Sequence, residues 1–193
     1  MNQPVDILET KILSDKKYLL EEVSFVFKKG RGAGLQQRRE VYKRNNSTTV
    51  LLYNTMQKTV ILTRQFRLPT YLSGNSSGMM IESCAGIMDE GESPEACIRR
   101  EALEETGYQL ETVEQIYKAF MSPASVTEQI HFFIAPYHSG MKVKDGGGLE
   151  AEQEYIEVLE LPFDEAYSLI AKGEIHDAKT IMLLQYIRLQ GIL

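Results

Sequence analysis

The segment that decides the fold is residues 86–108, which reads GIMDEGESPEACIRREALEETGY. Ser93 followed by Pro94 is typical of a helix N-terminus, because serine caps free amide groups and proline suits the first helical position. Gly107 is a residue type that commonly ends a helix. The segment therefore predicts a turn followed by a helix over residues 94–106.

Three glutamates of this predicted helix lie on one face. Glu101, Glu104 and Glu105 fall within an arc of about 100°, because successive helical residues are rotated by roughly 100°. Like charges at these spacings destabilise an isolated helix by roughly a few tenths of a kcal/mol each, and Arg100 offsets only part of that cost. The face is either a solvated acidic surface or a set of ligands for divalent cations.

The composition is that of a globular protein with a net charge of −6. The chain has 193 residues, of which 43% are hydrophobic and 25% charged, which suits one domain or one domain with a small appendage. The acidic balance argues against nucleic acids and membrane surfaces as partners, because both require a basic surface. Eight of the 27 acidic residues lie within residues 82–105, where divalent cations would neutralise them: Glu82, Asp89, Glu90, Glu92, Glu95, Glu101, Glu104 and Glu105.

The two cysteines, Cys84 and Cys97, argue against a disulfide framework or a cysteine-rich zinc site. The three histidines lie far apart in the sequence, so any metal would be held by carboxylates, which favours Mg²⁺, with Mn²⁺ as an alternative. The first residues have no secretion-signal pattern, and no apolar stretch is long enough to span a bilayer. We therefore expect a reduced, cytoplasmic protein.

The rest of the chain alternates predicted strands and helices, which indicates an α+β fold with a mixed sheet. Strands are predicted at residues 18–27, 38–44, 48–54, 59–66, 79–84, 116–120, 129–137 and 156–161. Further helices are predicted at residues 165–172 and 178–190, the second with Asp177 as its N-cap, and a mobile loop at residues 139–148. The pattern divides the chain into an N-terminal β appendage, residues 1–45, and a main domain, residues 46–193.

The glycine and charged positions of residues 86–108 match a known family pattern. Gly, five residues, Glu, seven residues and then REALEETGY resembles the box of the Nudix hydrolases, with matches at Gly86, Glu92, Arg100, Glu101, Glu104, Glu105 and Gly107. Ala102 stands where a larger aliphatic residue is usual, which should affect helix packing more than metal binding. The resemblance implies the Nudix fold, a mixed β-sheet sandwiched between helices, and a hydrolase.

Segments outside the box resemble the Nudix branch that acts on nucleoside diphosphate sugars, and within it the subgroup that hydrolyses GDP-mannose. The segments are LLYNTMQKTVILTRQFR, MIESCAG and MSPASVTEQIHFFIA, and Pro123 is at the position expected of this branch. Ala124 and Ser125 replace a glycine pair expected in the subgroup. The resemblance implies Mg²⁺-dependent hydrolysis of GDP-mannose to GMP and mannose 1-phosphate. The alternatives are an ADP-ribose or ADP-sugar pyrophosphatase, and a catalytically silent module that binds nucleotides.

The resemblance also implies roles for residues in and near the box. Glu101 and Glu105 are expected to bind the metal together with the Ala85 carbonyl, and Glu104 to act as a further ligand or to support catalysis. Arg100 is expected to orient the glutamates, while Gly86 lets the backbone approach the metal and the phosphates. The general base is expected at Glu154, which is also expected to bind metal. Glu152 is the alternative base, and the remaining alternative is that this loop is only a solvated acidic turn.

Substrate contacts are implied at residues scattered along the chain: Tyr18, Arg38, Arg39, Glu40, Arg67, Glu128 and Lys179. Arg67 suits phosphate recognition but could instead cap a hairpin. Lys179 is unfavourable to the helix dipole in a first helical turn, which indicates another purpose. A β appendage of this size buries little core by itself. By resemblance it forms a homodimer in which Arg38, Arg39 and Glu40 complete the partner's active site.

Overall fold

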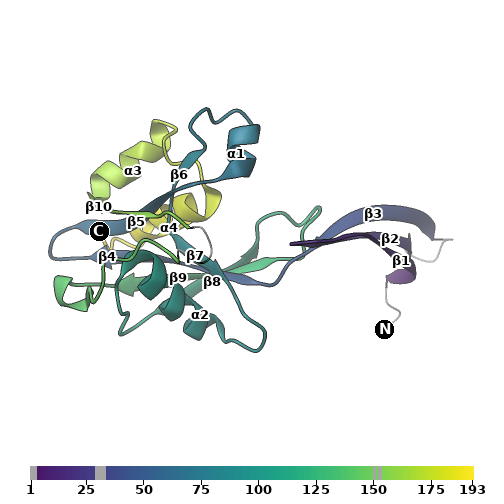
Figure 1. Cartoon of the computed structure of the whole chain (residues 1–193), viewed down its shortest axis with the longest axis horizontal. Helices are drawn as coiled ribbons and strands as arrows, with labels where there is room; N and C mark the ends of the chain where they lie inside the picture. Colours follow the sequence, from purple (N-terminus) through teal and green to yellow (C-terminus); the bar gives the residue numbers. More distant parts are fainter. Residues whose placement is uncertain (1–3, 29–33, 150, 152–153) are drawn as a thin grey trace. The chain divides into compact units, whose positions relative to one another are not determined.

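The computed structural model describes residues 4–28, 34–149, 151 and 154–193. The chain divides into two compact units (Figure 1). The first unit is Met1–Asn46 with Phe120–Gln129, and the second is Ser47–Ala119 with Ile130–Leu193. No helix in the described ranges has both the length and the apolar character that crossing a membrane requires.

The first unit contains a three-stranded antiparallel sheet. Its order is β1 (Val5–Asp15), β2 (Leu19–Phe27) and β3 (Leu35–Lys43), with β2 in the middle. The two later strands agree with the prediction, whereas β1 has no counterpart in it. Polar and apolar residues alternate irregularly in VDILETKILSD, and two register shifts interrupt its pairing with β2, so the sequence carries no clean strand period there.

A loop of the first unit is attached to the end of β3 by backbone hydrogen bonds. The amide of Tyr42 donates to the carbonyl of Ser125 at 2.8 Å, and the amide of Thr127 donates to the carbonyl of Tyr42 at 3.0 Å. Arg44 adds a bond from its amide to the Thr127 hydroxyl at 3.0 Å. These contacts explain why Phe120–Gln129 belongs to the first unit although it comes long after Lys43, the last residue of β3, in the sequence.

The second unit is built on a mixed sheet. The order is β10-β5-β4-β9-β8, with β6 also paired to β5 and β7 to β4. Only the β4–β9 pair is parallel among the strand pairs whose register the structure gives. The strands are β4 (Ser47–Asn54), β5 (Thr59–Phe66), β6 (Met79–Glu82), β7 (Cys84–Ile87), β8 (Glu114–Phe120), β9 (Gln129–Pro136) and β10 (Glu157–Pro162).

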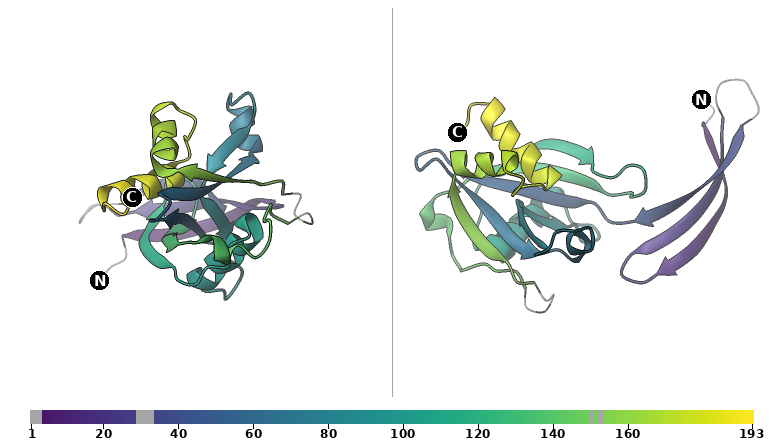
Figure 2. Two further views of the ribbon diagram at one scale, coloured as in Figure 1. Left: turned by 90° about the vertical axis from the view of Figure 1, so that its left-hand side faces the viewer. Right: turned by 90° about the horizontal axis from the view of Figure 1, so that it is seen from above.

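Helices cover both faces of this sheet. Figures 1 and 2 show α2 on one side and α3 and α4 on the other. The helices are α1 (Leu68–Leu72), α2 (Pro94–Glu101), α3 (Phe163–Ala171) and α4 (Ala178–Leu189), with a short 3₁₀ turn, η2 (Ser139–Met141). The core beneath α2 contains Val50, Ile61, Ile98, Ala102 and Phe133, all at most 1% exposed. Ala102 therefore serves packing, as expected.

Two elements differ from the prediction at the place where the acidic residues lie. The predicted helix over residues 94–106 is α-helical only to Glu101 and continues as a π-helical turn, η1 (Ala102–Thr106), which ends at Gly107 with φ 79°. The single strand predicted over residues 79–84 is two strands, because the chain leaves β5 after Glu82 and pairs with β4 from Cys84 onward. The turn at Ser83 brings β7 next to the π turn.

Candidate active site

The helix that carries the glutamates begins as the sequence predicts. The Ser93 hydroxyl accepts a hydrogen bond from the amide of Ala96 at 3.2 Å, and Pro94 occupies the first helical turn. The loop before it is closed by Glu92, whose carboxylate accepts from the amide of Asp89 at 3.1 Å. A capped start and a closed loop fix the direction in which α2 presents its last residues.

Arg100 binds three of the carboxylates. Its Nε and Nη2 donate to Glu92 at 3.2 and 3.1 Å, and its Nη1 donates to Glu101 at 2.8 Å and to Glu104 at 3.2 Å. The hydrogen bond to Glu92 is the main reason why the pKa of Arg100 is raised, and the charge of Glu101 adds to it. A guanidinium with this many donors acts as a clamp that sets where the acidic side chains lie.

Glu105 is the most buried acid of the group, with 2% of its surface exposed. The pKa of its carboxyl is raised to about 8, first by burial and also by the nearby charges of Glu101 and Glu154, against hydrogen bonds from Cys84 and from the Ala85 amide. Its carboxylate also accepts the amide of Ala85 at 3.2 Å, which ties η1 to β7. A buried carboxylate with negative neighbours is a group that a cation would stabilise.

Glu101 is also a partly buried acid with a raised pKa, although its pKa is raised less than that of Glu105. Burial raises its pKa to about 6, Arg100 opposes this shift, and the charges of Glu104 and Glu154 add to it. The backbone of β7 lies against this carboxylate at Gly86, where a Cβ atom would be 1.8 Å from the Glu101 Cδ. A side chain at position 86 would displace the Glu101 carboxylate, so glycine here leaves room for that glutamate.

These acids fit a divalent cation in their chemistry, since they are hard oxygen donors whose charges raise one another's pKa. In the described part of the chain, no three acidic, histidine or cysteine side chains already converge as a metal site. The reason is visible in the hydrogen bonds of Arg100, which hold the carboxylates of Glu101 and Glu104.

A run of three glycines brings Glu154 to the cluster. Gly146, Gly147 and Gly148 all have positive φ, and the amides of the last two donate to the carbonyls of Glu105 at 2.8 Å and Glu104 at 3.2 Å. The segment expected to be a mobile loop therefore contains η2 and, at its end, docks on η1. The alternative base, Glu152, lies outside the described residues.

Two of the predicted substrate contacts, Arg67 and Lys179, bind the same third residue. Glu82 accepts hydrogen bonds from the Arg67 Nε at 2.8 Å and from the Lys179 Nζ at 3.0 Å. Lys179 also lies 3.0 Å from Asp177, the N-cap of α4, so two acids offset its unfavourable place in the helix dipole. Glu82 had no role in the sequence analysis, although it belongs to the acidic stretch, because its pairing depends on α4.

The remaining predicted substrate residues belong to the first unit. The Arg44 guanidinium lies 5.0 Å from the centre of the Tyr18 ring and 3.6 Å from the Glu128 carboxylate, so it joins two of them. Arg44 itself was not predicted, and its buried Nε has no hydrogen-bond partner among the described atoms. Arg38, Arg39 and Glu40 are exposed on β3.

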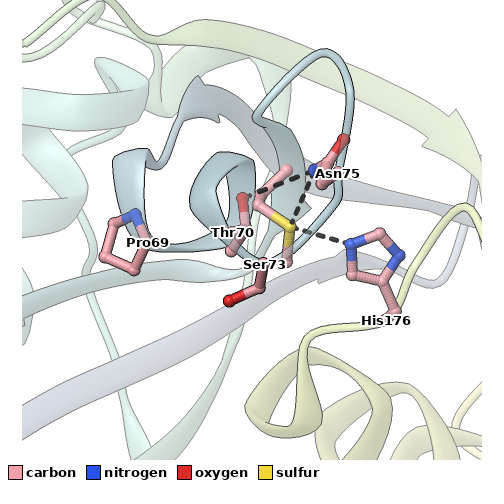
Figure 3. Close-up of a pocket in the computed structure, with 6 residues that line it drawn as sticks. Pro69, Thr70, Ser73, Asn75 and His176 are labelled. Carbon is pink, nitrogen blue, oxygen red and sulfur yellow. Dashed lines mark hydrogen bonds between the residues drawn. The ribbon is translucent and has the colours of Figure 1, made fainter.

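A separate pocket lies beside α1. Its volume is about 380 Å³, and Figure 3 shows its walls, which are formed by Pro69, Thr70, Ser73, Asn75, Met80 and His176. The Met80 sulfur lies 3.8 Å from the Asn75 amide nitrogen and 2.9 Å from the His176 Nε2. Met80 and Glu82 are both buried on one face of β6. The pocket, which Met80 lines, therefore lies on the same face of this strand as Glu82, the residue that binds Arg67 and Lys179.

Comparison with protein families identifies the fold and the box together. The NUDIX domain model matches residues 43–184, and the model of the GDP-mannose pyrophosphatase NudK N-terminal domain matches residues 4–42. This chain belongs to the Nudix family. Nudix hydrolases generally use divalent metal ions such as Mg²⁺, which agrees with the chemistry of the acidic cluster.

Curated relatives of this Nudix protein match it over almost its whole length. One from Pectobacterium atrosepticum, named GDP-mannose pyrophosphatase, is 52% identical over 191 residues, covering 99% of this chain and 97% of the relative. Another of the same name, from Yersinia enterocolitica, is 50% identical over 193 residues, covering both chains completely. A solved ADP compounds hydrolase has the same fold, with a TM-score of 0.74 and 19% identity over 99% of this chain and 98% of that one. The predicted α+β Nudix fold is confirmed.

Proposed function

We propose that this Nudix protein hydrolyses the pyrophosphate bond of GDP-mannose, giving GMP and mannose 1-phosphate. The observation that carries the proposal is its identity of about 50%, over full length, with proteins named GDP-mannose pyrophosphatase. The acidic box is complete in sequence and is gathered by Arg100 into one cluster. A module that only bound nucleotides would have no need of this cluster, which counts against the silent alternative.

The residues proposed to hold Mg²⁺, or Mn²⁺ in its place, are Glu101 and Glu105 with the Ala85 carbonyl. Such an ion neutralises phosphate charge and activates water when it is bound. The burial of Glu105 beside two other negative charges supports its assignment, because a cation relieves that repulsion. Glu104 is proposed as a further ligand. Arg100, bound to both Glu101 and Glu104, is proposed to orient them.

Glu154 is proposed as the general base, and as a metal ligand when its carboxylate is charged. It would take the proton of the water that attacks phosphorus, while the bond to the bridging oxygen breaks. Its position supports this role, since its charge acts on both Glu101 and Glu105. The glycines before it are proposed to let Glu154 lie against the backbone that carries the other acids.

Substrate recognition is proposed to come from both units. Arg67 and Lys179 would bind the phosphates, since both are cations held by Glu82 at the end of β6, and Gly86 would allow the phosphates to approach its backbone. Tyr18 and Glu128, joined by Arg44, would contact the nucleotide or the sugar.

We also propose that the protein is a homodimer and that it is located in the cytoplasm. Residues 1–45 would form its dimerisation part and residues 46–193 its hydrolase domain. Apolar side chains of the first unit that are more than two-fifths exposed support a partner surface there: Ile7, Leu8, Ile12, Leu13, Phe27, Leu35, Tyr42 and Phe120. Arg38, Arg39 and Glu40, exposed on β3 of the same unit, are proposed to reach the active site of the partner.

A panel of substrates tests the proposal. The protein is incubated with GDP-mannose, ADP-ribose, ADP-glucose and NADH, with and without Mg²⁺, and the products are separated by chromatography. We expect the highest kcat/KM with GDP-mannose and no turnover without a divalent ion. Faster hydrolysis of ADP-ribose would overturn the substrate but keep the chemistry. No turnover of any compound would leave the binding module as the function.

A further inference from the structure

Glu82 is a buried acid that joins two distant parts of the chain. It is the last residue of β6, with 5% of its surface exposed. Its Oε2 accepts from Arg67 Nε and lies 2.8 Å from Arg67 Nη2, while its Oε1 accepts from Lys179 Nζ at 3.0 Å. Arg67 precedes α1, and Lys179 is in the first turn of α4. One carboxylate thus fixes a cation from each of two elements.

The strand turn that carries Glu82 is itself fastened to α4. The amide of Ser83 donates to the Thr180 hydroxyl at 2.7 Å, and that hydroxyl donates to Asp177 at 2.6 Å. Ser83 also hydrogen-bonds through its side chain to Thr49 on β4 at 2.7 Å. These residues are buried or nearly so, and their bonds leave little freedom for the backbone on either side of Glu82.

Glu82 does not use all the donor groups of Arg67 and Lys179. The side chain of Glu82 is 7% exposed, whereas that of Arg67 is 40% exposed. Arg67 uses Nε and Nη2 on Glu82, and its Nη1 has no hydrogen-bond partner within the described residues. Lys179 uses two of its three donors on Glu82 and Asp177. Both cations are therefore held by acids. Arg67 keeps an exposed donor for an anion, whereas Lys179, whose side chain is 12% exposed, keeps one ammonium proton outside its two ion pairs.

We propose that Glu82 is a positioning residue that holds Arg67 and Lys179 in place for the two phosphates of the substrate, a proposal that rests on the function proposed above. A free arginine or lysine side chain samples many rotamers, and ordering it on binding weakens affinity. Glu82 orders both side chains before the substrate arrives. It touches the two cations and acts on the substrate only through them.

The test is the steady-state kinetics of Glu82→Gln with GDP-mannose and Mg²⁺. The amide keeps the size of the side chain but loses its charge and one acceptor, so we expect KM to rise about tenfold and kcat to change less than about threefold. The Mg²⁺ concentration for half-maximal rate should stay within about twofold, because Glu82 is bound to Arg67 and Lys179 and is not one of the proposed metal ligands. Glu157→Gln is the matched control, since Glu157 forms an ion pair with another arginine at 3.3 Å. That arginine, Arg64, lies on β5, three residues before Arg67 in the sequence.

A double-mutant cycle separates positioning from general structural damage. If Glu82 acts through Arg67 and Lys179, Glu82→Gln should raise KM by a smaller factor in the Arg67→Gln background than in the wild type, because only its effect through Lys179 remains there. Fully additive increases would overturn the proposal. Should Glu82→Gln fold poorly by circular dichroism, Glu82→Asp keeps the charge, and a KM between those of the wild type and of Arg67→Gln is expected. A KM for Glu82→Asp as high as that of Arg67→Gln would contradict it.

The outcomes distinguish this proposal from the proposed function. If the wild type hydrolyses GDP-mannose and Glu82→Gln has the same KM as Glu157→Gln, only the positioning role is overturned. If the wild type leaves GDP-mannose intact, the proposed function is overturned and the positioning role falls with it.

Discussion

Within the acidic cluster, the unfavourable burial of negative charge falls mainly on one side chain, that of Glu105. It is almost fully buried, it has two negative neighbours, and its partners are the amide of Ala85 and the thiol of Cys84. Such a group is unfavourable to the fold as an anion, so its presence needs a functional reason. The proposed reason is the metal ion, and two predictions at the scale of this residue follow from it.

The first prediction is that Glu105→Gln lowers kcat about a hundredfold or more, because a neutral amide is a poor ligand for Mg²⁺. The fold should persist, since the amide has the same shape and no longer repels Glu101. Steady-state hydrolysis of GDP-mannose measures the rate, and circular dichroism checks the fold. Glu95→Gln, an exposed acid in the first turn of the same helix, is the control and should retain full activity. A Glu105→Gln protein as active as this control would refute the assignment.

The second prediction concerns the pH dependence of stability without metal. The pKa of Glu105 is about 8 in the folded protein against an ordinary value of 4.5, so between these pH values the folded state holds a proton that the unfolded state has lost. The free energy of unfolding is then fully retained below pH 4.5 and falls as the pH rises toward 8, by about 5 kcal/mol at most. Urea unfolding in a chelator at pH 5 and pH 8 measures it.

Glu105→Gln supplies the comparison for this pH effect. The variant has no carboxyl at this position, so most of the loss between pH 5 and pH 8 should disappear. Equal pH dependence in the wild type and the variant would show that the proton is held elsewhere.

Among the elements, the three glycines at residues 146–148, two of which are hydrogen-bonded to η1, are proposed to set the position of the base Glu154. Gly148 has φ +82°, and a Cβ there would lie 2.7 Å from the Cβ of Glu154. We predict that Gly148→Ala lowers kcat at least about tenfold, because Glu154 must move. Gly173→Ala is the matched control, since Gly173 has φ +72° and nothing within 4 Å of the added Cβ. It carries the same backbone strain without the clash, and an equal loss in both variants would contradict the role of the loop.

The elements that the sequence predicts well are those with local signals. Ser93 and Asp177 cap their helices as expected, and the β-branched runs form β4 and β5. The π turn at Ala102–Thr106 and the break at Ser83 were missed, because both depend on pairing with distant strands. The same holds for Glu82 and Arg44, whose partners lie far along the chain. The class of reaction was therefore easier to predict from the sequence than the ion pairs and hydrogen bonds that position the side chains.

At the scale of the whole molecule, the proposed dimer makes a prediction about mixed subunits. If Arg38 acts in the partner's active site, Arg38→Ala and Glu105→Gln should each be nearly inactive alone but partly active after co-refolding. Random pairing gives heterodimers with one intact site, so about a quarter of wild-type activity is expected. Glu101→Gln mixed with Glu105→Gln is the control, because both changes lie in the same box and no site is restored. No gain in the first mixture would contradict a shared site.

The central claim is that this Nudix protein cleaves the pyrophosphate bond of GDP-mannose with a metal held by the acidic cluster. The most direct measurement is chromatography of the products formed from GDP-mannose with Mg²⁺ and after addition of a chelator. The account predicts GMP and mannose 1-phosphate in equal amounts, formed only when the divalent ion is present. Intact GDP-mannose, or cleavage to GDP and free mannose, would contradict it.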